Sequence, residues 1–395
     1  MEALTQTLNL LTKKIEGLVI RGKKLEEENQ FLLKELNRVK EELNYTMKVL
    51  KDKKRIKKKT TNNQKLKKIV TTISKHFDKE KLLGNSKVDS LALLSESNIV
   101  TGIFCSLCIW DINCSSKTVE KIYEKEKAHD DNINYINIIN QGKEILSCSS
   151  DTTIKLWNTS NKTKLKHIGT FKGHTELVSQ VIYLENDKQI VSCSPDDHTI
   201  KLWDINKTKP LKSISEDQMF QPSALLQLKD KSRLLVNCFG YICTYSTSKF
   251  KQIKRLEGLD TGSRYGLLEV SDDYVAVSQD YPPKISLVKV SDLTIVNEIK
   301  DKDYISGSGA LAMLSDNYIV YVKSGNICQL SFTNNKLKLD YKKQVSKEEV
   351  DGHSGIIVFN DYQYFVTNTD FRLKKDSKSK NRLNGITVYN IRYSE

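Results

Sequence analysis

The chain has 395 residues, 38% of them hydrophobic, and a formal net charge of +14 at pH 7. This apolar content excludes a wholly disordered chain, and the length favours two regions or one repeated architecture. No run of about 18 apolar residues occurs and the N-terminus lacks a signal-peptide pattern, so we expect neither a membrane-spanning helix nor secretion. The eight cysteines have no regular spacing, which favours a reducing compartment over a disulfide framework.

Residues 1–52 carry a heptad pattern. Apolar residues recur at alternating steps of four and three from Leu4 to Leu50, which predicts a parallel coiled-coil dimer. Asn29 fits an a position because two copies can pair across a two-stranded interface and fix its register. The alternative is a single helix that packs its apolar stripe against the rest of the protein. The expected dimer seam contains Leu25, Asn29, Leu32, Leu36, Val39 and Leu43.

A lysine-rich segment, residues 53–68, follows the heptads. Residues 48–68 hold eleven basic residues against Asp52 alone, so most of the net charge is local. The segment is either a solvated linker, a nuclear localisation signal, or a contact to RNA or to an acidic membrane. It has no interleaved aromatic residues, so base stacking is not favoured. Its densest part is Lys53, Lys54, Arg55, Lys57, Lys58 and Lys59.

Beyond residue 68, one short strand pattern recurs. It is clearest in "SCSSDTTIKLWN" (147–158) and "SCSPDDHTIKLWD" (192–204). A turn is followed by alternating apolar residues, and the strand ends on a large side chain. A period of 42–47 residues, lengthened at the end by the polar insert 371–384, predicts an array of repeated β-sheets. The closing residues are Trp110, Trp157, Trp203, Tyr245, Val288, Leu330 and Tyr389.

These copies resemble WD40 repeats, which form the four-stranded blades of a closed propeller. The resemblance covers residues 69–395 and is strongest in the two copies quoted above and in "DGHSGIIVF" (351–359) with "TNTD" (367–370). It implies an all-β, seven-bladed propeller preceded by the coiled coil. The β-branched run 69–74 is expected to pair with the C-terminal blade, "GITVYNIRYSE", and so close the ring without an open sheet edge.

The resemblance also implies a buried polar chain in the best repeats. In the family, an Asp of the b–c turn bonds a His of the d–a turn, the His bonds a Ser or Thr of strand b, and that hydroxyl bonds the Trp. We interpret these groups as structural, because the same set recurs at blade period without an added catalytic group, and such a chain stabilises only when every member is satisfied. The sets are Asp151–His129–Ser147–Trp157, Asp197–His174–Ser192–Trp203 and, ending in a tyrosine, Asp370–His353–Thr367.

Motifs of catalysis are missing from the sequence. It has no P-loop, no Gly-rich dinucleotide turn, no HExxH and no GxSxG. Cys105 and Cys108 form a CxxC pair with Cys114 nearby, but a tetrahedral zinc site needs a fourth ligand and no convincing one follows. We therefore expect a protein that is not an enzyme and that has no metal or cofactor.

The family resemblance places the d–a and b–c turns on one rim, where partners often dock. Asp130, Asp131, Glu176 and Asp196 should lie there and would suit a peptide with Lys or Arg side chains. The insert of the seventh blade adds basic residues to the same rim, among them Arg372, Lys374 and Lys375. The alternative is that both sets lie in solvated loops without a ligand.

Two functional hypotheses follow from these patterns. The first is a cytoplasmic scaffold or adaptor, in some cases cytoskeleton-associated, in which a homodimer of propellers binds other proteins with raised avidity. The second is a nuclear or nucleic-acid-associated factor that is recruited through residues 51–68. Architecture alone does not choose the partner.

Overall fold

The computed structural model describes residues 66–76, 88–113, 116, 118–159, 164–184, 188–215, 220–259, 266–279, 284–300, 310–315, 317–323, 326–344, 356–359, 364–372 and 382–393. The chain divides into two compact units, one of which spans Leu66–Ser394. Residues 1–65 lie outside the described ranges, so the coiled coil over 1–52 and residues 53–65 of the basic segment remain predictions. Residues 66–68 of that segment belong to the first described strand, so the expected boundary at residue 69 was wrong by three residues. No helix among the described residues is both long and apolar enough to cross a membrane.

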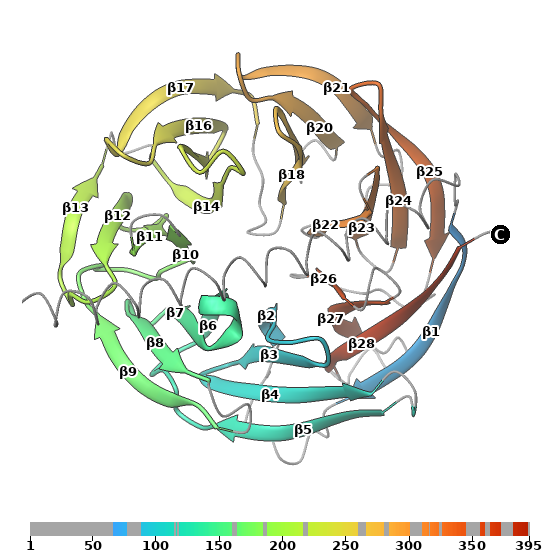
Figure 1. Cartoon of the computed structure of the whole chain (residues 1–395), viewed down its shortest axis with the longest axis horizontal. Helices are drawn as coiled ribbons and strands as arrows, with labels where there is room; N and C mark the ends of the chain where they lie inside the picture. The colour runs from blue at the N-terminus through green and yellow to red at the C-terminus, as the bar shows by residue number, and fades with distance from the viewer. Residues whose placement is uncertain are drawn as a thin grey trace, which may run out of the picture. The chain divides into compact units, whose positions relative to one another are not determined.

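In the described ranges the unit Leu66–Ser394 is an all-β ring of four-stranded sheets (Figure 1). Six of these sheets, which we call blades 1 to 6, each consist of four consecutive antiparallel strands. Blade 1 contains β2 (Val88–Leu93), β3 (Asn98–Ile103), β4 (Ser106–Asn113) and β5 (Thr118–Lys125). Blade 2 contains β6 (Ile133–Ile139), β7 (Glu144–Ser149), β8 (Ile154–Asn158) and β9 (Lys166–Phe171), with a 3-10 turn η2 (Asn140–Gly142) between its first two strands. Blade 3 contains β10 (Gln180–Leu184), β11 (Gln189–Ser194), β12 (Thr199–Asp204) and β13 (Pro210–Ile214).

The second half of the ring repeats this plan. Blade 4 contains β14 (Pro222–Gln227), β15 (Arg233–Cys238), β16 (Tyr241–Ser246) and β17 (Lys251–Glu257). Blade 5 contains β18 (Leu267–Ser271), β19 (Tyr274–Gln279), β20 (Lys284–Lys289) and β21 (Thr294–Lys300). Blade 6 contains β22 (Ala310–Ser315), β23 (Tyr318–Lys323), β24 (Asn326–Thr333) and β25 (Lys336–Gln344). In every blade the first strand faces the centre of the ring and the fourth lies on its circumference (Figure 1).

A seventh four-stranded sheet in the described residues draws on both ends of the unit. It contains β26 (Ile356–Phe359), β27 (Tyr364–Arg372), β28 (Arg382–Tyr393) and, as its outer strand, β1 (Leu66–His76). β1, which includes residues 69–74, pairs antiparallel with β28, with Ile69 opposite Ile391 and Ser74 opposite Thr387. The first and last described strands therefore share one sheet, and β28 has a hydrogen-bonded neighbour on both sides.

A β-bulge recurs at one position of the ring. In blades 1 to 6 the ladder between the third and fourth strands slips just before the residue that ends the repeated sequence pattern, for example between Leu202 and Trp203. In the seventh sheet the slip in β1 falls between Thr71 and Ile73, opposite Tyr389 and Val388. A bulge increases local twist and makes an outer edge a poor template for another strand. The unpaired bulge residues of blades 1 to 6 are Ile122, Ile168, Leu211, Ile253, Val296 and Asp340.

The hydrophobic core lies between neighbouring blades. One cluster joins Leu146 and Ile154 of blade 2 to Val181 and Trp203 of blade 3, all of them buried. Because neighbouring blades cover both faces of a sheet, the second strand of a blade is buried on both sides: β3 is buried along its whole length, and β7, β11 and β15 are buried except for their first residue. Burial of this apolar surface, at about 25 cal/mol per Å2, is the main term that holds adjacent blades together.

Candidate interaction rim

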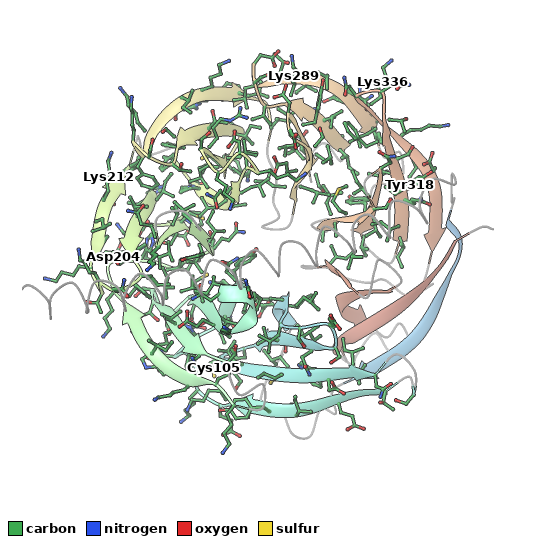
Figure 2. All side chains as sticks on the ribbon, in the orientation of Figure 1. Cys105, Asp204, Lys212, Lys289, Tyr318 and Lys336 are labelled. Carbon is green, nitrogen blue, oxygen red and sulfur yellow. The ribbon has the colours of Figure 1, made fainter. Side chains whose placement is uncertain are left out.

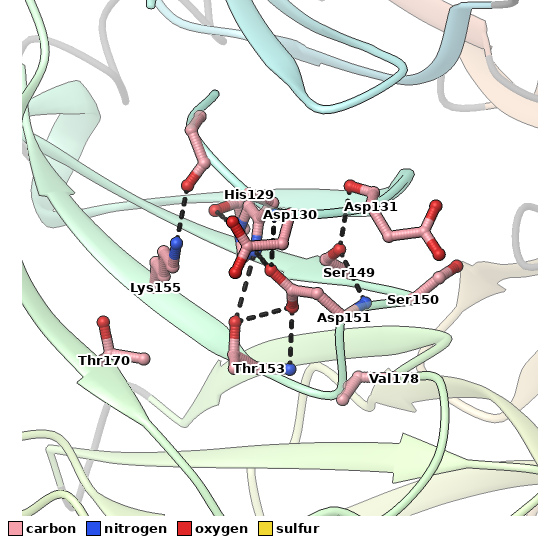
Figure 3. Close-up of polar contacts among 12 residues, drawn as sticks. His129, Asp130, Asp131, Ser149, Ser150, Asp151, Thr153, Lys155, Thr170 and Val178 are labelled. Carbon is pink, nitrogen blue, oxygen red and sulfur yellow. Dashed lines mark hydrogen bonds and ion pairs between the residues drawn. The ribbon is translucent and has the colours of Figure 1, made fainter. Parts of the chain in front are cut away.

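A buried chain of hydrogen bonds runs through blade 2 to the rim, and Figure 3 shows its outer part around His129, Asp151 and Thr153. The Trp157 indole N–H donates to Ser147 Oγ at 2.8 Å, and Ser147 Oγ lies 2.8 Å from His129 Nε2. His129 Nδ1 lies 2.8 Å from Asp151 Oδ2. With a neutral imidazole, the serine donates to Nε2 and Nδ1–H donates to the carboxylate, so every polar group of the chain has a partner.

Blade 3 contains the same arrangement. The Trp203 indole N–H donates to Ser192 Oγ at 2.8 Å, and Ser192 Oγ lies 2.7 Å from His174 Nε2. His174 Nδ1 lies 2.6 Å from Asp197 Oδ2. The distances reproduce those of blade 2 because the same residues stand at the same strand positions.

The hydrogen-bond chains of blades 2 and 3 each contain a threonine that the sequence analysis did not single out. Thr153 donates its hydroxyl and its backbone N–H to Asp151 Oδ1, at 2.6 and 2.9 Å. Thr199 bonds Asp197 in the same way, at 2.6 and 3.0 Å. The available signal was a threonine two residues after the aspartate in both copies. The residue between them has a positive φ, 69° for Thr152, which turns the chain back toward the aspartate.

The other blades depart from this chain. In blade 1 the Trp110 indole donates to Thr101 Oγ1 at 2.8 Å, which is the inner half of the same arrangement. At the positions that the serine and the tryptophan occupy in blades 2 and 3, blades 4 to 6 have apolar or aromatic residues, all of them buried. A well-packed apolar pair can replace a buried polar one without loss of stability. These pairs are Tyr245 with Val236, Val288 with Val277, and Leu330 with Tyr321.

The third expected set is only partly described. Thr367 and Asp370 lie in β27, whereas His353 lies outside the described residues. The contacts among these three side chains therefore remain a prediction. Of the basic residues expected on the same rim, Arg372 ends β27, and Lys374 and Lys375 lie outside the described residues.

The polar chains fix the backbone that carries the acidic residues of the rim. Asp151 Oδ2 also accepts the backbone N–H of Asp130 at 3.0 Å, and Asp197 Oδ2 accepts that of Thr175 at 3.3 Å. Asp130, Glu176 and Asp196 are exposed, whereas Asp131 is half-buried. A carboxylate oxygen of Asp131 also accepts the backbone N–H of Asn132. Three of the four expected carboxylates are thus directed to solvent on ordered loops.

An exposed aromatic residue lies in the turn next to the loop of Asp130 and Asp131. Phe104, in the turn between β3 and β4, is 49% exposed. Its carbonyl accepts the N–H of Ile133 at 2.8 Å, and the carbonyl of Cys105 accepts the N–H of His129 at 3.1 Å. These bonds attach the turn of blade 1 to the loop that carries Asp130 and Asp131. The rim therefore combines negative charge with one apolar contact.

The cysteine pair of blade 1 has the environment of core residues. Cys108 is buried, and burial raises the pKa of its thiol to about 12. Cys105 is partly exposed, and Cys114 lies outside the described residues. Within the ranges that the structure describes, no group of three or more His, Cys, Asp or Glu side chains could hold a metal ion.

Burial controls the protonation of the two His–Asp pairs. It lowers the pKa of His129 and His174, against the hydrogen bonds to the aspartates, which raise it. Burial raises the pKa of Asp151 and Asp197, but the hydrogen bonds from the histidines and threonines outweigh it and bring both below the usual value. Near neutral pH the imidazoles are therefore neutral and the carboxylates ionised.

We expect the stability of the propeller to fall as the pH is lowered from 7.5 to 5.5. The folded-state pKa of each histidine lies below the unfolded value of 6.5, so protons bind the unfolded chain preferentially. The stability that the two neutral histidines contribute is complete above about pH 6.5, and it is lost as the pH falls toward their lowered folded-state pKa. The urea midpoint at the two pH values measures the effect. Equal midpoints at both pH values would contradict the expectation.

Comparison with known proteins agrees with this geometry. Residues 120–158 and 165–204 match the family model described as WD domain, G-beta repeat. The second match runs from β9 to β12, so the family repeat combines the outer strand of one blade with three strands of the next. This offset explains why the outer strand of the last sheet comes from the N-terminal side of the unit.

Solved structures resemble the whole ring. The structure of U3-55K has a TM-score of 0.61 and 13% sequence identity, and the match covers 82% of this chain and 98% of that chain. The crystal structure of RRP9 WD40 repeats has a TM-score of 0.63 and 14% identity, with 82% and 100% covered. At such identities the likeness concerns the fold alone. No curated protein matches the sequence closely enough to count as a relative.

Proposed function

We propose that this protein, whose body is a WD40-repeat β-propeller, is a non-enzymatic scaffold or adaptor that binds partner proteins on the rim of blades 1 to 3. The expected ligand is a segment with Lys or Arg side chains next to an apolar residue. The supporting observation is that Asp130, Glu176 and Asp196 are exposed on loops whose backbone is held by hydrogen bonds to Asp151 and Asp197, and that the turn of exposed Phe104 is bonded to the loop of Asp130. Complementary charges steer such an encounter, and the ordered loops lower its entropic cost.

The His–Asp pairs have the residue types of catalytic dyads, but their geometry favours a structural role. Both ring nitrogens of His129 and of His174 are engaged, one by a carboxylate and one by a serine. Each serine in turn accepts a hydrogen bond from a tryptophan indole. All these histidine, serine and tryptophan side chains are buried. A general base must reach the proton that it abstracts, and these imidazoles face the protein.

The proposal extends to the part of the chain outside the described residues. The heptads over 1–52 would pair two propellers, and a partner that displays its motif twice would then bind with raised avidity. A cytoplasmic location is part of this proposal. The alternative, nuclear or nucleic-acid association through the basic residues 51–68, makes a different experimental prediction.

Reversal of the rim charges tests the proposal. The triple variant D130K/E176K/D196K should lose most of the proteins that the wild-type chain captures, and should bind a Lys/Arg-containing peptide from that set at least about tenfold more weakly. The control is E96K/D272K/D292K, which changes the charge equally at exposed residues in the turns at the opposite ends of the strands. This control should capture as much partner protein as the wild type. An equal loss of capture in both variants would contradict partner binding at the rim.

Salt dependence separates the alternative function. Binding to nucleic acid through residues 51–68 should collapse between about 50 and 200 mM salt, because phosphate contacts release counterions. It should also disappear when Lys53, Lys54, Arg55, Lys57, Lys58 and Lys59 are replaced by glutamine. Capture of proteins by the rim should survive both changes.

A further inference from the structure

The bulge residues of the outer strands are exposed aliphatic side chains in five of the six described blades. Ile122, Ile168, Leu211, Ile253 and Val296 are 40, 47, 47, 51 and 42% exposed. Each stands opposite the residue that ends the repeated pattern, where the slip leaves it without a partner on the neighbouring strand. The bulge by itself explains why these positions are exposed. It does not explain the charge that surrounds some of them.

The outer strands differ in charge from one part of the ring to another. β9, β13 and β17 carry five basic residues, Lys166, Lys212, Lys251, Lys254 and Arg255, against Glu257 alone. β5 has two basic and two acidic residues, and β21 has one of each. β25 has four basic residues against Asp340, but Asp340 is itself the bulge residue, so this strand has no aliphatic side chain at that position. β9, β13 and β17 combine an aliphatic bulge residue with an excess of basic residues, belong to consecutive blades and follow one another along the circumference (Figure 1). We call Ile168, Leu211 and Ile253, together with these five basic residues, the outer belt.

Hydrogen bonds hold part of the outer belt in place. Lys212 Nζ donates to the carbonyl of Phe250 at 3.0 Å and lies 6.0 Å from the centre of its ring, in the next blade. Lys254 Nζ donates to the carbonyl of Ser291, also in the next blade, at 2.9 Å. Figure 2 shows Lys212 on the outside of the ring. Lys212 and Lys254, the residues after two of the bulges, therefore tie neighbouring blades together, while Leu211 and Ile253 remain exposed.

We propose that the outer belt docks the propeller edge-on to an anionic lipid bilayer. Exposed Lys and Arg side chains near an anionic surface each contribute about 1 kcal/mol of attraction, and single aliphatic side chains can enter the interfacial region without a complementary pocket. A protein ligand would need pockets for Leu211 and Ile253. Nucleic acid would gain nothing from aliphatic side chains, and the one exposed ring on β9, β13 and β17, the imidazole of His167, is hydrogen-bonded to Thr170 and packs edge-on against Trp157.

This surface lies on the circumference, apart from the rim, so the inference does not depend on the proposed function. The lysine-rich segment 53–65 directly precedes β1 in the chain. Because this segment is itself basic, it contributes its own attraction to an anionic bilayer. The experiment must therefore measure the two contributions separately.

Vesicle co-sedimentation of the full chain tests the proposal. The probe is a phosphatidylcholine vesicle with about 30% phosphatidylserine, in about 0.1 M salt, compared with phosphatidylcholine alone. L211S/I253S should lower the partition coefficient about tenfold, because two aliphatic insertions are lost. K251Q/R255Q should lower it about tenfold through lost charge. Wild type should not bind the neutral vesicle.

The matched control uses the same bulges on the charge-balanced strands. I122S/V296S removes two equally exposed aliphatic residues and should leave partitioning within about twofold of wild type. All variants alter exposed residues, and thermal melting verifies that they fold. The comparison is repeated with residues Lys53, Lys54, Arg55, Lys57, Lys58 and Lys59 replaced by glutamine, where L211S/I253S should again lower binding.

Three outcomes would overturn the proposal. The first is equal loss in L211S/I253S and I122S/V296S. The second is binding that disappears with the glutamine substitutions at 53–59 but is insensitive to every change in the outer belt. The third is an affinity for an RNA oligonucleotide or an acidic peptide that equals the affinity for the anionic vesicle and that L211S/I253S does not change.

Discussion

Deletion of residues 1–76 is expected to abolish the cooperative unfolding of the propeller, whereas deletion of residues 1–65 should preserve it. The two truncations differ only by β1, which pairs with β28 from Leu66 opposite Tyr393 to His76 opposite Gly385. Without β1, the outer edge of β28 would be left with unpaired backbone groups, and the described N-terminal strands would be joined to the last sheet only by packing, as of β2 against β26, β27 and β28, and no longer by a hydrogen-bonded ladder.

Urea unfolding and gel filtration measure this effect. The shorter protein should lose more than about 4 kcal/mol of unfolding free energy or should aggregate through its open edge. The 1–65 deletion serves as the control, because it removes the same flanking sequence but keeps the strand. If both truncations unfold at the same urea concentration with equal steepness, ring closure by β1 does not stabilise the protein.

Replacement of His174 by alanine is expected to lower the free energy of unfolding by about 3 kcal/mol. The change leaves Asp197 as a largely buried carboxylate without its imidazole partner, and it leaves the O–H of Ser192, whose oxygen still accepts from Trp203, without its acceptor. Removal of one member of a buried, hydrogen-bonded pair costs more than the net value of the bond, because the remaining groups are not resolvated. Chemical denaturation of the variant measures the loss.

A double-mutant cycle makes this prediction specific to the chain of hydrogen bonds. H174A/D197A should be less destabilised than the sum of its single variants, with a coupling of about 1 kcal/mol or more. The control is E176Q, an exposed change two residues away that should stay within about 0.5 kcal/mol of wild type. Additive losses would mean that His174 stabilises the blade by packing against Trp203 rather than through Asp197.

The repeated strands and the inner polar chains could be predicted from sequence because both depend on local pattern. Alternation of apolar residues locates a strand, and the large closing residue marks the same position in each copy. Trp157 and Trp203 are buried, and their indoles bond the serines that the WD40 resemblance indicated. Thr153 and Thr199 were missed because their contribution depends on the reversal of the chain at Thr152 and His198, which alternation does not encode.

The candidate surfaces required more than local pattern. Asp131 matched its neighbours in sequence, but it is half-buried and bonded to the backbone, while Asp130 is exposed. Lys166 and Arg255 are far apart in sequence, and in the repeat pattern they are ordinary polar residues. They belong to one surface, the outer belt, only because consecutive blades place their outer strands next to one another.

The amino-acid sequence by itself determined the repeat period, the strands that end on Trp110, Trp157 and Trp203, and the groups able to satisfy one another inside blades 2 and 3. These features depend on side-chain alternation and on hydrogen-bonding capacity, which are properties of short segments. Only the tertiary structure decided that the fourth strand slips by one residue and exposes Leu211 and Ile253. It also decided which charges on separate blades share a surface. The physical reason is that closure of the ring sets twist and exposure, and both depend on contacts between residues distant in the chain.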